Sequence, residues 1–300
     1  MGYLFLLLAL SCGLLKAYCG KISSSAVSCS YDAVVLNTVR MILCVFIGLL
    51  FVLSGGGAAL TVTTPKILAI ALLCGISTAC FAVLWLLAVR TMAYMLVEVF
   101  VMGGVIVPLT LCAFFYKEPI GRWQLIGVIL LLAAVYCMCT CKNTDKANLA
   151  KKDFLLLLLC SLSSGISDFS QKLYTKEIEN ANISLFNLYT YLAASIVLLA
   201  SCFFFKKKEK DGIKIKPLRE IVRPIFHYVA IMAVCLFLNA YFKTLSAKYL
   251  DAILLYPLNQ GCAVLLSLIM SAIIFKEKIN AKGYLGVALA IIAMILINIL

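Results

Sequence analysis

The sequence predicts an all-α polytopic membrane protein with ten transmembrane helices, arranged as two inverted five-helix repeats. Of the 300 residues, 64% are hydrophobic and only 13% are charged, whereas an ordinary soluble protein has about 25% charged residues. The apolar residues occur in runs of about 20, the length that a helix needs to cross about 30 Å of hydrocarbon. The third observation is an internal repeat at a constant offset.

The repeat is clearest at two charged turns, each of which separates two apolar runs. Lys276 and Glu277 follow Lys117 and Glu118 at an offset of 159 (277 − 118). The same offset relates Val264, Leu268, Ala272, Ile279, Gly286, Val287, Leu289 and Ala293 to Val105, Leu109, Ala113, Ile120, Gly127, Val128, Leu130 and Ala134. A constant offset over so long a stretch indicates a duplicated unit.

The first unit, residues 1–141, contains five apolar runs that we expect to span the membrane. Its connection from Ser54 to Lys66 contains three consecutive glycines, which cannot easily continue a helix. The first run lacks the basic segment of a cleaved signal peptide, so we expect it to be retained as a span. The expected spans are residues 3–20, 33–53, 67–89, 93–115 and 123–141.

The second unit, residues 153–300, follows a polar linker at 142–152 and contains five further runs. Its connection from Lys206 to Arg223 is rich in lysine, and we expect a lipid-facing cytoplasmic loop there. Because each unit has an odd number of spans, the second enters the membrane in the opposite sense, an architecture found in secondary transporters. The expected spans are residues 153–172, 184–205, 225–245, 251–274 and 281–300.

The charge and the cysteines exclude other classes of protein. The net charge of +13 comes from lysines between the apolar runs, as is typical of the positive-inside bias of membrane proteins, so we expect no nucleic-acid partner. Most of the 14 cysteines lie within the spans, where a thiol behaves as a small hydrophobic group. Cys137, Cys139 and Cys141 lack companion histidines or carboxylates, so we expect no metal site and no cofactor.

Both halves carry a pattern that resembles a known family. The pattern is an aromatic and alanine-rich span, a short turn, a span of small residues, a charged turn and a glycine-containing last span. It occurs as WLLAVRTMAYMLVEV…FYKEPIGRWQLIGV and again as YFKTLSAKYLDAILLY…IFKEKINAKGYLGV. This resembles the drug/metabolite transporter superfamily, in its ten-span EamA-type branch, and implies a transporter of small solutes.

The final spans are similar to the single-repeat small multidrug resistance proteins, through Tyr256, Gly261, Glu277 and Gly286. Those proteins carry an essential glutamate in their first span. This chain has Lys16 in that region and no acidic residue, so their mechanism does not transfer to it.

Glu98 is the clearest candidate for chemistry, because an ionisable side chain within a span is costly and is often functional. Tyr94 and Met102 lie one turn to either side of it, on the same helix face. Two interpretations are open: a carboxylate that couples transport to protons or binds a cation, or a structural ion pair with Arg40 or Lys16.

Lys16, Arg40 and Asp168 are further charged candidates. Asp168 corresponds to Lys16 at an offset of 152 (168 − 16), as Ser163 and Gly165 do to Ser11 and Gly13. In an inverted repeat, Lys16 and Asp168 approach a central cavity from opposite faces. Each can line a substrate path or form a structural pair, and for Arg40 we favour the structural role.

Polar residues near the start of run 251–274 share one helix face. Tyr256, Asn259, Gln260 and Ala263 follow the spacing i, i+3, i+4, i+7. Buried amides and phenols need hydrogen-bond partners, and either a substrate cavity or a neighbouring helix can provide them. Trp85 is a weaker candidate for the same cavity.

The sequence therefore predicts a secondary active transporter or exporter of a small organic solute, such as a metabolite, an amino acid or an organic cation. It works by alternating access and is coupled to protons or driven by exchange. We expect a monomer or homodimer in the lipid bilayer of the bacterial inner membrane. The alternatives are a non-transporting membrane scaffold or a membrane enzyme acting on lipid-linked substrates, although the sequence shows no cluster of catalytic groups.

Overall fold

The computed structural model describes residues 1–55, 63–117, 121–139, 151–179, 182–207, 218–276 and 281–298, and every regular element within these ranges is helical. The elements are α1 (Gly2–Ser24), α2 (Ser30–Ser54), α3 (Pro65–Thr91), α4 (Tyr94–Gly103), α5 (Ile106–Tyr116), α6 (Arg122–Cys139), α7 (Lys151–Glu177), α8 (Ile183–Lys207), α9 (Leu218–Val222), η3 (Arg223–Ile225), α10 (Phe226–Ala247), α11 (Ala252–Ile273) and α12 (Ala281–Asn298).

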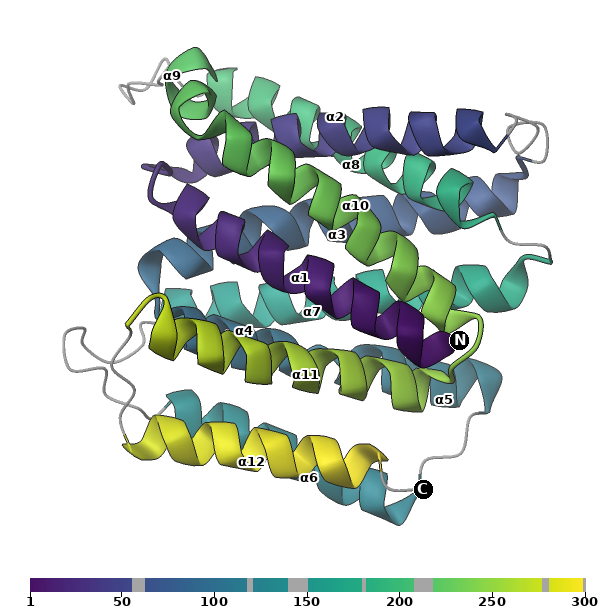
Figure 1. The fold of residues 1–300 in the computed structure, drawn as a ribbon, viewed down its shortest axis with the longest axis vertical. Coiled ribbons are helices and arrows are strands. Elements are labelled where there is room, and N and C mark those ends of the chain that lie inside the picture. Colours follow the sequence, from purple (N-terminus) through teal and green to yellow (C-terminus); the bar gives the residue numbers. More distant parts are fainter. Residues whose placement is uncertain are drawn as a thin grey trace.

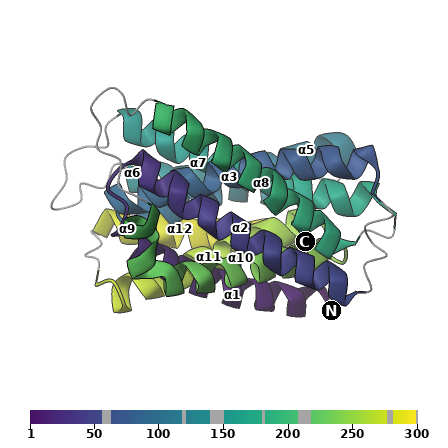
Figure 2. The same ribbon diagram turned by 90° about the horizontal axis from the view of Figure 1, so that it is seen from above.

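The long helices lie along one common direction, so their connections gather at two opposite ends of the bundle (Figures 1 and 2). Within the described residues, eight helices are long and apolar enough to cross a membrane, with α4 and α5 together forming one of them. Two further helices, α6 and α12, have 18 residues each. Each expected span coincides with one of these helices to within a few residues.

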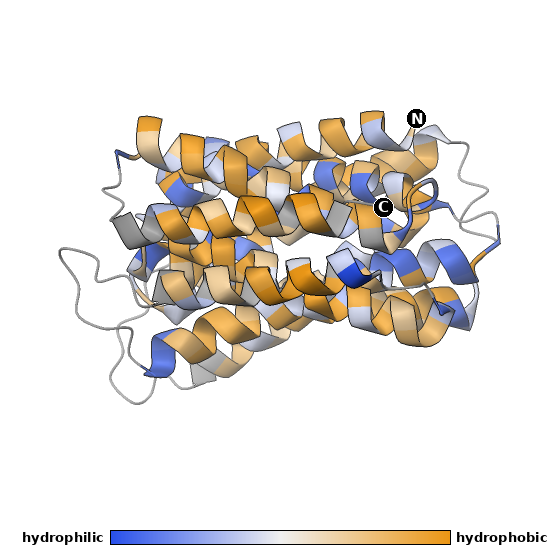
Figure 3. Ribbon diagram, turned by 90° about the horizontal axis from the view of Figure 1, so that it is seen from below, coloured by the Kyte–Doolittle hydropathy of each residue, from blue (hydrophilic) through white to orange (hydrophobic). Residues whose placement is uncertain are grey.

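The outer face of the bundle is apolar, the reverse of a soluble protein. Phe46, Leu50, Ile196 and Ile269 are more than half exposed, and hydrophobic residues dominate the helices seen in Figure 3. Since water does not solvate such a surface favourably, it is suited to contact with lipid chains.

Helices from the first and second halves pair across the bundle. The most extensive contacts join α1 with α10, α3 with α7, α2 with α8, and α6 with α12. The last pair lies at the lower edge of Figure 1, and α11 packs on α4 and α5. The two halves are therefore interleaved.

Hydrogen bonds at the end of α10 fix the relative directions of α1 and α7. Ser246 donates to the carbonyl of Gly2 at 2.6 Å, and Lys172 donates to the carbonyl of Ala247 at 3.1 Å. The beginning of α1 and the last part of α7 therefore meet at the same end of the bundle. It follows that α1 and α7, the first helices of their respective halves, run in opposite directions.

A lysine from the first helix of each half binds the end of that half's third long helix. Lys21 of α1 donates to the carbonyl of Val89 at 3.3 Å near the end of α3. Lys172 of α7, which is 1% exposed, also donates to the carbonyl of Leu250 at 2.6 Å just after α10. Because α3 and α10 end at opposite sides of the bundle (Figure 1), the two contacts lie at opposite ends.

The backbone repeats at the charged turns as well. Lys117 and Lys276, which are related by the offset of 159, adopt left-handed backbone conformations with φ of 52° and 50°. Within the described residues, no other non-glycine residue has a positive φ. An unfavourable conformation for an L-residue thus recurs at equivalent positions, after α5 and after α11.

The span 94–116 is interrupted at Gly104 and Val105, a break that the sequence analysis did not predict. Pro108 explains it, because proline has no N–H to donate to the carbonyl four residues earlier, and its ring collides with that carbonyl. The residue four positions before Pro108 is Gly104, the C-cap residue directly after α4. The span is consequently two short helices, α4 and α5.

The break lies against α7 in an unusually close backbone contact. A Cβ atom added to Gly104 would lie 2.3 Å from the carbonyl oxygen of Ser161, and one added to Gly165 would lie 2.3 Å from the carbonyl oxygen of Gly104. Backbone atoms cannot move aside as a flexible side chain can. Both positions therefore require glycine.

Residues 142–150 of the expected linker at 142–152 lie outside the described residues. Its last two residues, 151 and 152, belong to α7, which begins at Lys151. The expected basic loop from 206 to 223 is described only at its two ends. At its far end the chain forms α9 and η3 before α10 begins.

We predict that Gly165→Ala lowers the stability of the protein by about 1–3 kcal/mol, because the added methyl group overpacks the contact with Gly104. The measurement is the melting temperature of the purified protein in detergent. Gly55→Ala is the control, since an added Cβ there meets atoms only at 3.5 Å and beyond. Equal melting temperatures for the two variants would contradict the close contact.

Candidate functional site

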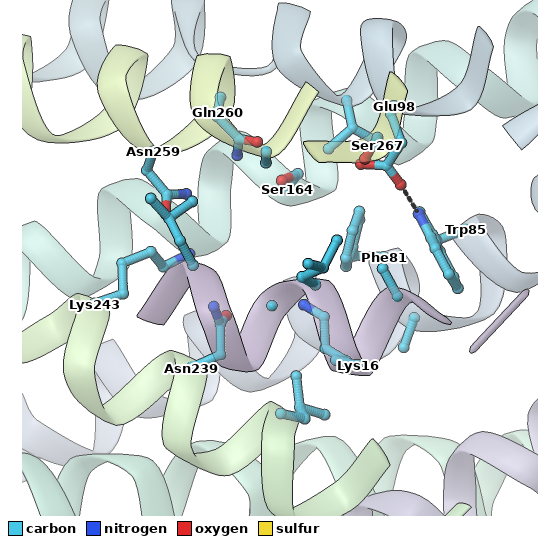
Figure 4. A pocket seen from close by; sticks show the side chains of 18 of the residues that line it. Lys16, Phe81, Trp85, Glu98, Ser164, Asn239, Lys243, Asn259, Gln260 and Ser267 are labelled. Carbon is cyan, nitrogen blue, oxygen red and sulfur yellow. Dashed lines mark hydrogen bonds between the residues drawn. The ribbon is translucent and has the colours of Figure 1, made fainter. Parts of the chain in front are cut away.

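A cavity of about 140 Å³ lies within the bundle, between helices of both halves (Figure 4). Since about 10–15 Å³ suffices for one water molecule, it has room for several waters or a small solute. Its walls come from α1, α2, α3 and α4 in the first half and from α7, α10 and α11 in the second. The polar and aromatic side chains that line it are those of Lys16, Arg40, Thr78, Phe81, Trp85, Tyr94, Glu98, Ser164, Asn239, Lys243, Asn259, Gln260 and Ser267.

Glu98 lies on one side of the cavity, where α4 faces α3. The indole N–H of Trp85 donates to Glu98 Oε1 at 2.9 Å. One turn before Glu98 on α4, Tyr94 shares a hydrogen bond of 3.0 Å with Ser267 of α11, and its ring meets the Trp85 ring edge-on at 6.4 Å. Aromatic side chains from two helices thus hold the carboxylate in place.

The position of Trp85 depends on a glycine in α1. A Cβ atom added to Gly20 would lie 2.7 Å from the indole ring of Trp85. The absence of a side chain at this position lets the ring lie against the helix while its N–H reaches Glu98.

Asp168 lies beside the opposite side of the cavity, on α7. Its Oδ1 accepts a hydrogen bond of 2.5 Å from Lys243 of α10, and its Oδ2 accepts one of 3.3 Å from Gln260 of α11. The hydroxyl of Tyr256 donates to the Asp168 carbonyl at 2.6 Å. Asp168 is 2% exposed, so a cation and hydrogen-bond donors compensate a buried charge.

Lys16 and Arg40 line the same cavity without a carboxylate within 4 Å in the part of the chain that the structure describes. Arg40 is 5% exposed, and its Nε has no hydrogen-bond partner among the described residues. Figure 4 shows Lys16 extending from α1 between the Glu98 side and the Lys243 side. The cavity therefore contains two cationic groups that no carboxylate contacts directly.

The structure brings the sequence-based candidates together. Six of them line the cavity: Lys16, Arg40, Trp85, Glu98, Asn259 and Gln260. Asp168 and Tyr256 do not line it. Asp168 accepts hydrogen bonds from the lining residues Lys243 and Gln260, and Tyr256 donates to the backbone carbonyl of Asp168. The alternative for Glu98, an ion pair with Arg40 or Lys16, is absent among the described ion pairs.

Lys243 was not predicted from the sequence as a site residue, yet it lines the cavity and pairs with Asp168. A signal was available, because Lys243 is a charged residue inside the apolar run 225–245. The cost of burying a charge in a membrane, which singled out Glu98, applies equally to this lysine.

Residues 151–299 match the EamA-like transporter family. The second half of the chain belongs to this family. No curated protein matches the sequence. Among solved structures, a chain described as "Crystal structure of protein" has a TM-score of 0.70 at 13% sequence identity, and the match covers 99% of this chain and 96% of that one. The fold of the solved chain thus extends over both halves.

The resemblance to the EamA-type branch of the drug/metabolite transporter superfamily is therefore confirmed. The family consists of transporters of small solutes, rather than enzymes. The family match and the apolar helices together show an integral, multi-pass membrane protein.

We predict that Lys243→Met lowers stability by about 3–5 kcal/mol, because it leaves Asp168 as a buried charge without its cation. The double variant Lys243→Met with Asp168→Asn should recover much of that loss, since it removes both charges. Melting temperatures of the two variants in detergent test this.

The matched control is the ion pair of Lys66 and Glu177, whose side chains are 54% and 35% exposed. Lys66→Met should lower the melting temperature much less than Lys243→Met does, because water screens an exposed pair. If Lys243→Met cost no more than Lys66→Met, the buried pair would not hold α7 and α10 together.

Proposed function

We propose that the protein is a secondary active transporter that moves a small organic solute by alternating access to the central cavity. One observation carries this proposal: a polar cavity with two carboxylates and three cations in or beside its walls is buried in a bundle whose outer face is apolar. Charged groups within a membrane are costly, and in transporters they line the solute or ion pathway.

The two halves form an inverted repeat in this proposal, with residues 1–141 and 153–300 as the units and 142–152 as the linker. The offset of 159, the matching backbone of Lys117 and Lys276 and the opposite directions of α1 and α7 support it. Helices α6 and α12 then complete ten spans. A site between such repeats can open to either side of the membrane in turn.

Glu98 is the group that we propose to couple transport to protons. Its described hydrogen bond comes from Trp85 rather than from a cation, so no ion pair fixes its charge. A carboxylate of this kind can gain or lose a proton as the contents of the cavity change. Exchange of one solute for another is the alternative driving force.

The site gives less support to the two alternatives, a non-transporting scaffold and a membrane enzyme. A non-transporting scaffold has no use for Glu98, Lys16 and Arg40 around a cavity, since each raises the cost of insertion. A membrane enzyme needs a nucleophile, base or metal ligand set near its substrate, and the described residues include no group of three or more metal-binding side chains. The bacterial inner membrane and the monomeric or dimeric state stay predictions.

Uptake into proteoliposomes under an imposed pH gradient tests the function. The panel contains organic cations, amino acids, small carboxylates and neutral metabolites, measured in both gradient directions. For Glu98→Gln we expect gradient-driven uptake of the transported solute to fall at least tenfold, while exchange of labelled for unlabelled solute continues, because exchange needs no net proton movement.

Glu220→Gln is the control, since Glu220 is an exposed carboxylate on α9, away from the cavity. It should transport as the unmodified protein does. Full gradient-driven uptake in Glu98→Gln would assign the coupling to another group. The absence of saturable transport across the panel would count against the transporter itself.

A further inference from the structure

We propose that the cavity binds a solute through an anionic group, such as a carboxylate, held by Lys16 and Arg40. This inference rests on the proposed transport function and names the class of solute. Three observations support it: the charges of the cavity, the unmet Nε donor of Arg40 and the divergence of the duplicated unit.

The charges of the cavity do not balance. Lys16, Arg40 and Lys243 line it, together with Glu98, and Asp168 lies directly behind Lys243. Lys243 and Asp168 neutralise each other at 2.5 Å. Among the described lining residues, two cations and one carboxylate remain, which gives the cavity an excess positive charge even when Glu98 is ionised. An anion compensates this charge, and an organic cation adds to it.

The guanidinium of Arg40 has one buried donor, Nε, that no acceptor among the described residues meets. Its guanidinium carries five N–H groups and cannot lose its charge in a protein. The residue is 5% exposed, and its Nε lacks any acceptor. An unsatisfied buried polar group destabilises a protein, and a charged one does so more strongly. A carboxylate accepts two parallel hydrogen bonds from a planar guanidinium. A solute with a carboxylate can therefore supply the acceptor that Arg40 lacks.

The excess positive charge of the cavity arises from a difference in charged residues between the two units. Position 16 of the first unit corresponds to Asp168 in the second. The partner of Asp168 is Lys243, and the offset of 159 places the apolar Leu84 at the corresponding position of the first half (243 − 159). The second unit thus contains a neutral pair, whereas the first contains a lone cation at its equivalent position.

Glu98 does not neutralise the positive charge of Lys16 and Arg40 through an ion pair. It lies against Trp85 on the other side of the cavity from Lys243 (Figure 4), and no described cation comes within 4 Å of it. A proton on Glu98 neutralises the one carboxylate among the described lining residues, which would otherwise repel an anionic solute. Binding of a proton and binding of an anion therefore favour each other by ordinary linkage.

The test measures binding directly, through the fluorescence of Trp85. The chain has two tryptophans, and Trp123→Phe removes the other, a 55% exposed residue of α6. Butyrate, butyramide and butylamine are titrated into this single-tryptophan protein in detergent, because they have similar size and differ in charge. We expect butyrate to bind at least tenfold more tightly than butyramide, and butylamine to bind more weakly than either.

Lys16→Gln and Arg40→Gln should each weaken butyrate binding about tenfold and leave butyramide binding nearly unchanged. Lys66→Gln, an exposed cation outside the cavity, should alter neither. If Arg40→Gln does not fold, the butyrate affinity of Lys16→Gln alone tests the proposal. Equal affinities for butyrate and butyramide, or tighter binding of butylamine, would overturn the proposal.

The outcomes for solute class and for transport can be separated. Butyrate binding that depends on Lys16, without saturable uptake of any carboxylate in proteoliposomes, would support the anion site and count against the transporter. Saturable transport of an organic cation, with no preference for butyrate in the binding assay, would support the transporter and overturn the anion site.

Discussion

The hydrocarbon interior of a membrane contains no water, so every polar group within it needs a partner inside the protein. This constraint explains both the outside and the inside of the bundle. Apolar side chains cover the outer face, and the carboxylates of Glu98 and Asp168 turn inward to aromatic, amide and ammonium donors. The same constraint makes Arg40 conspicuous, because its Nε has no acceptor within the described chain.

The helical segments could be predicted from the sequence because an apolar run of sufficient length has few other stable structures in a membrane. The break at Gly104 was missed, although Pro108 was visible, because a proline in a membrane helix can also be accommodated without a break. For the site, the cost of burying polar groups identified Glu98, Asp168, Asn259 and Gln260.

The partners of these residues could not be found in the same way. Asp168 and Lys243 are 75 positions apart, and their contact depends on how α7 packs against α10. Likewise, the bond from Trp85 to Glu98 depends on the space beside Gly20. Sequence periodicity assigns a residue to a helix face, but only the packing of helices determines which faces meet.

Close packing at one point also restricts how the two halves can move. The backbone at Gly104, in the break between α4 and α5, lies so close to the backbone of α7 at Gly165 that not even a methyl group fits. Helices in such contact cannot slide past each other without collision, although they can tilt. If one half of the molecule tilts against the other, the contact between Gly104 and Gly165 is the point about which it turns. Glu98 lies six residues before Gly104 (104 − 98), less than two helical turns away. A tilt about this contact that opens one end of the bundle therefore shifts the carboxylate only slightly.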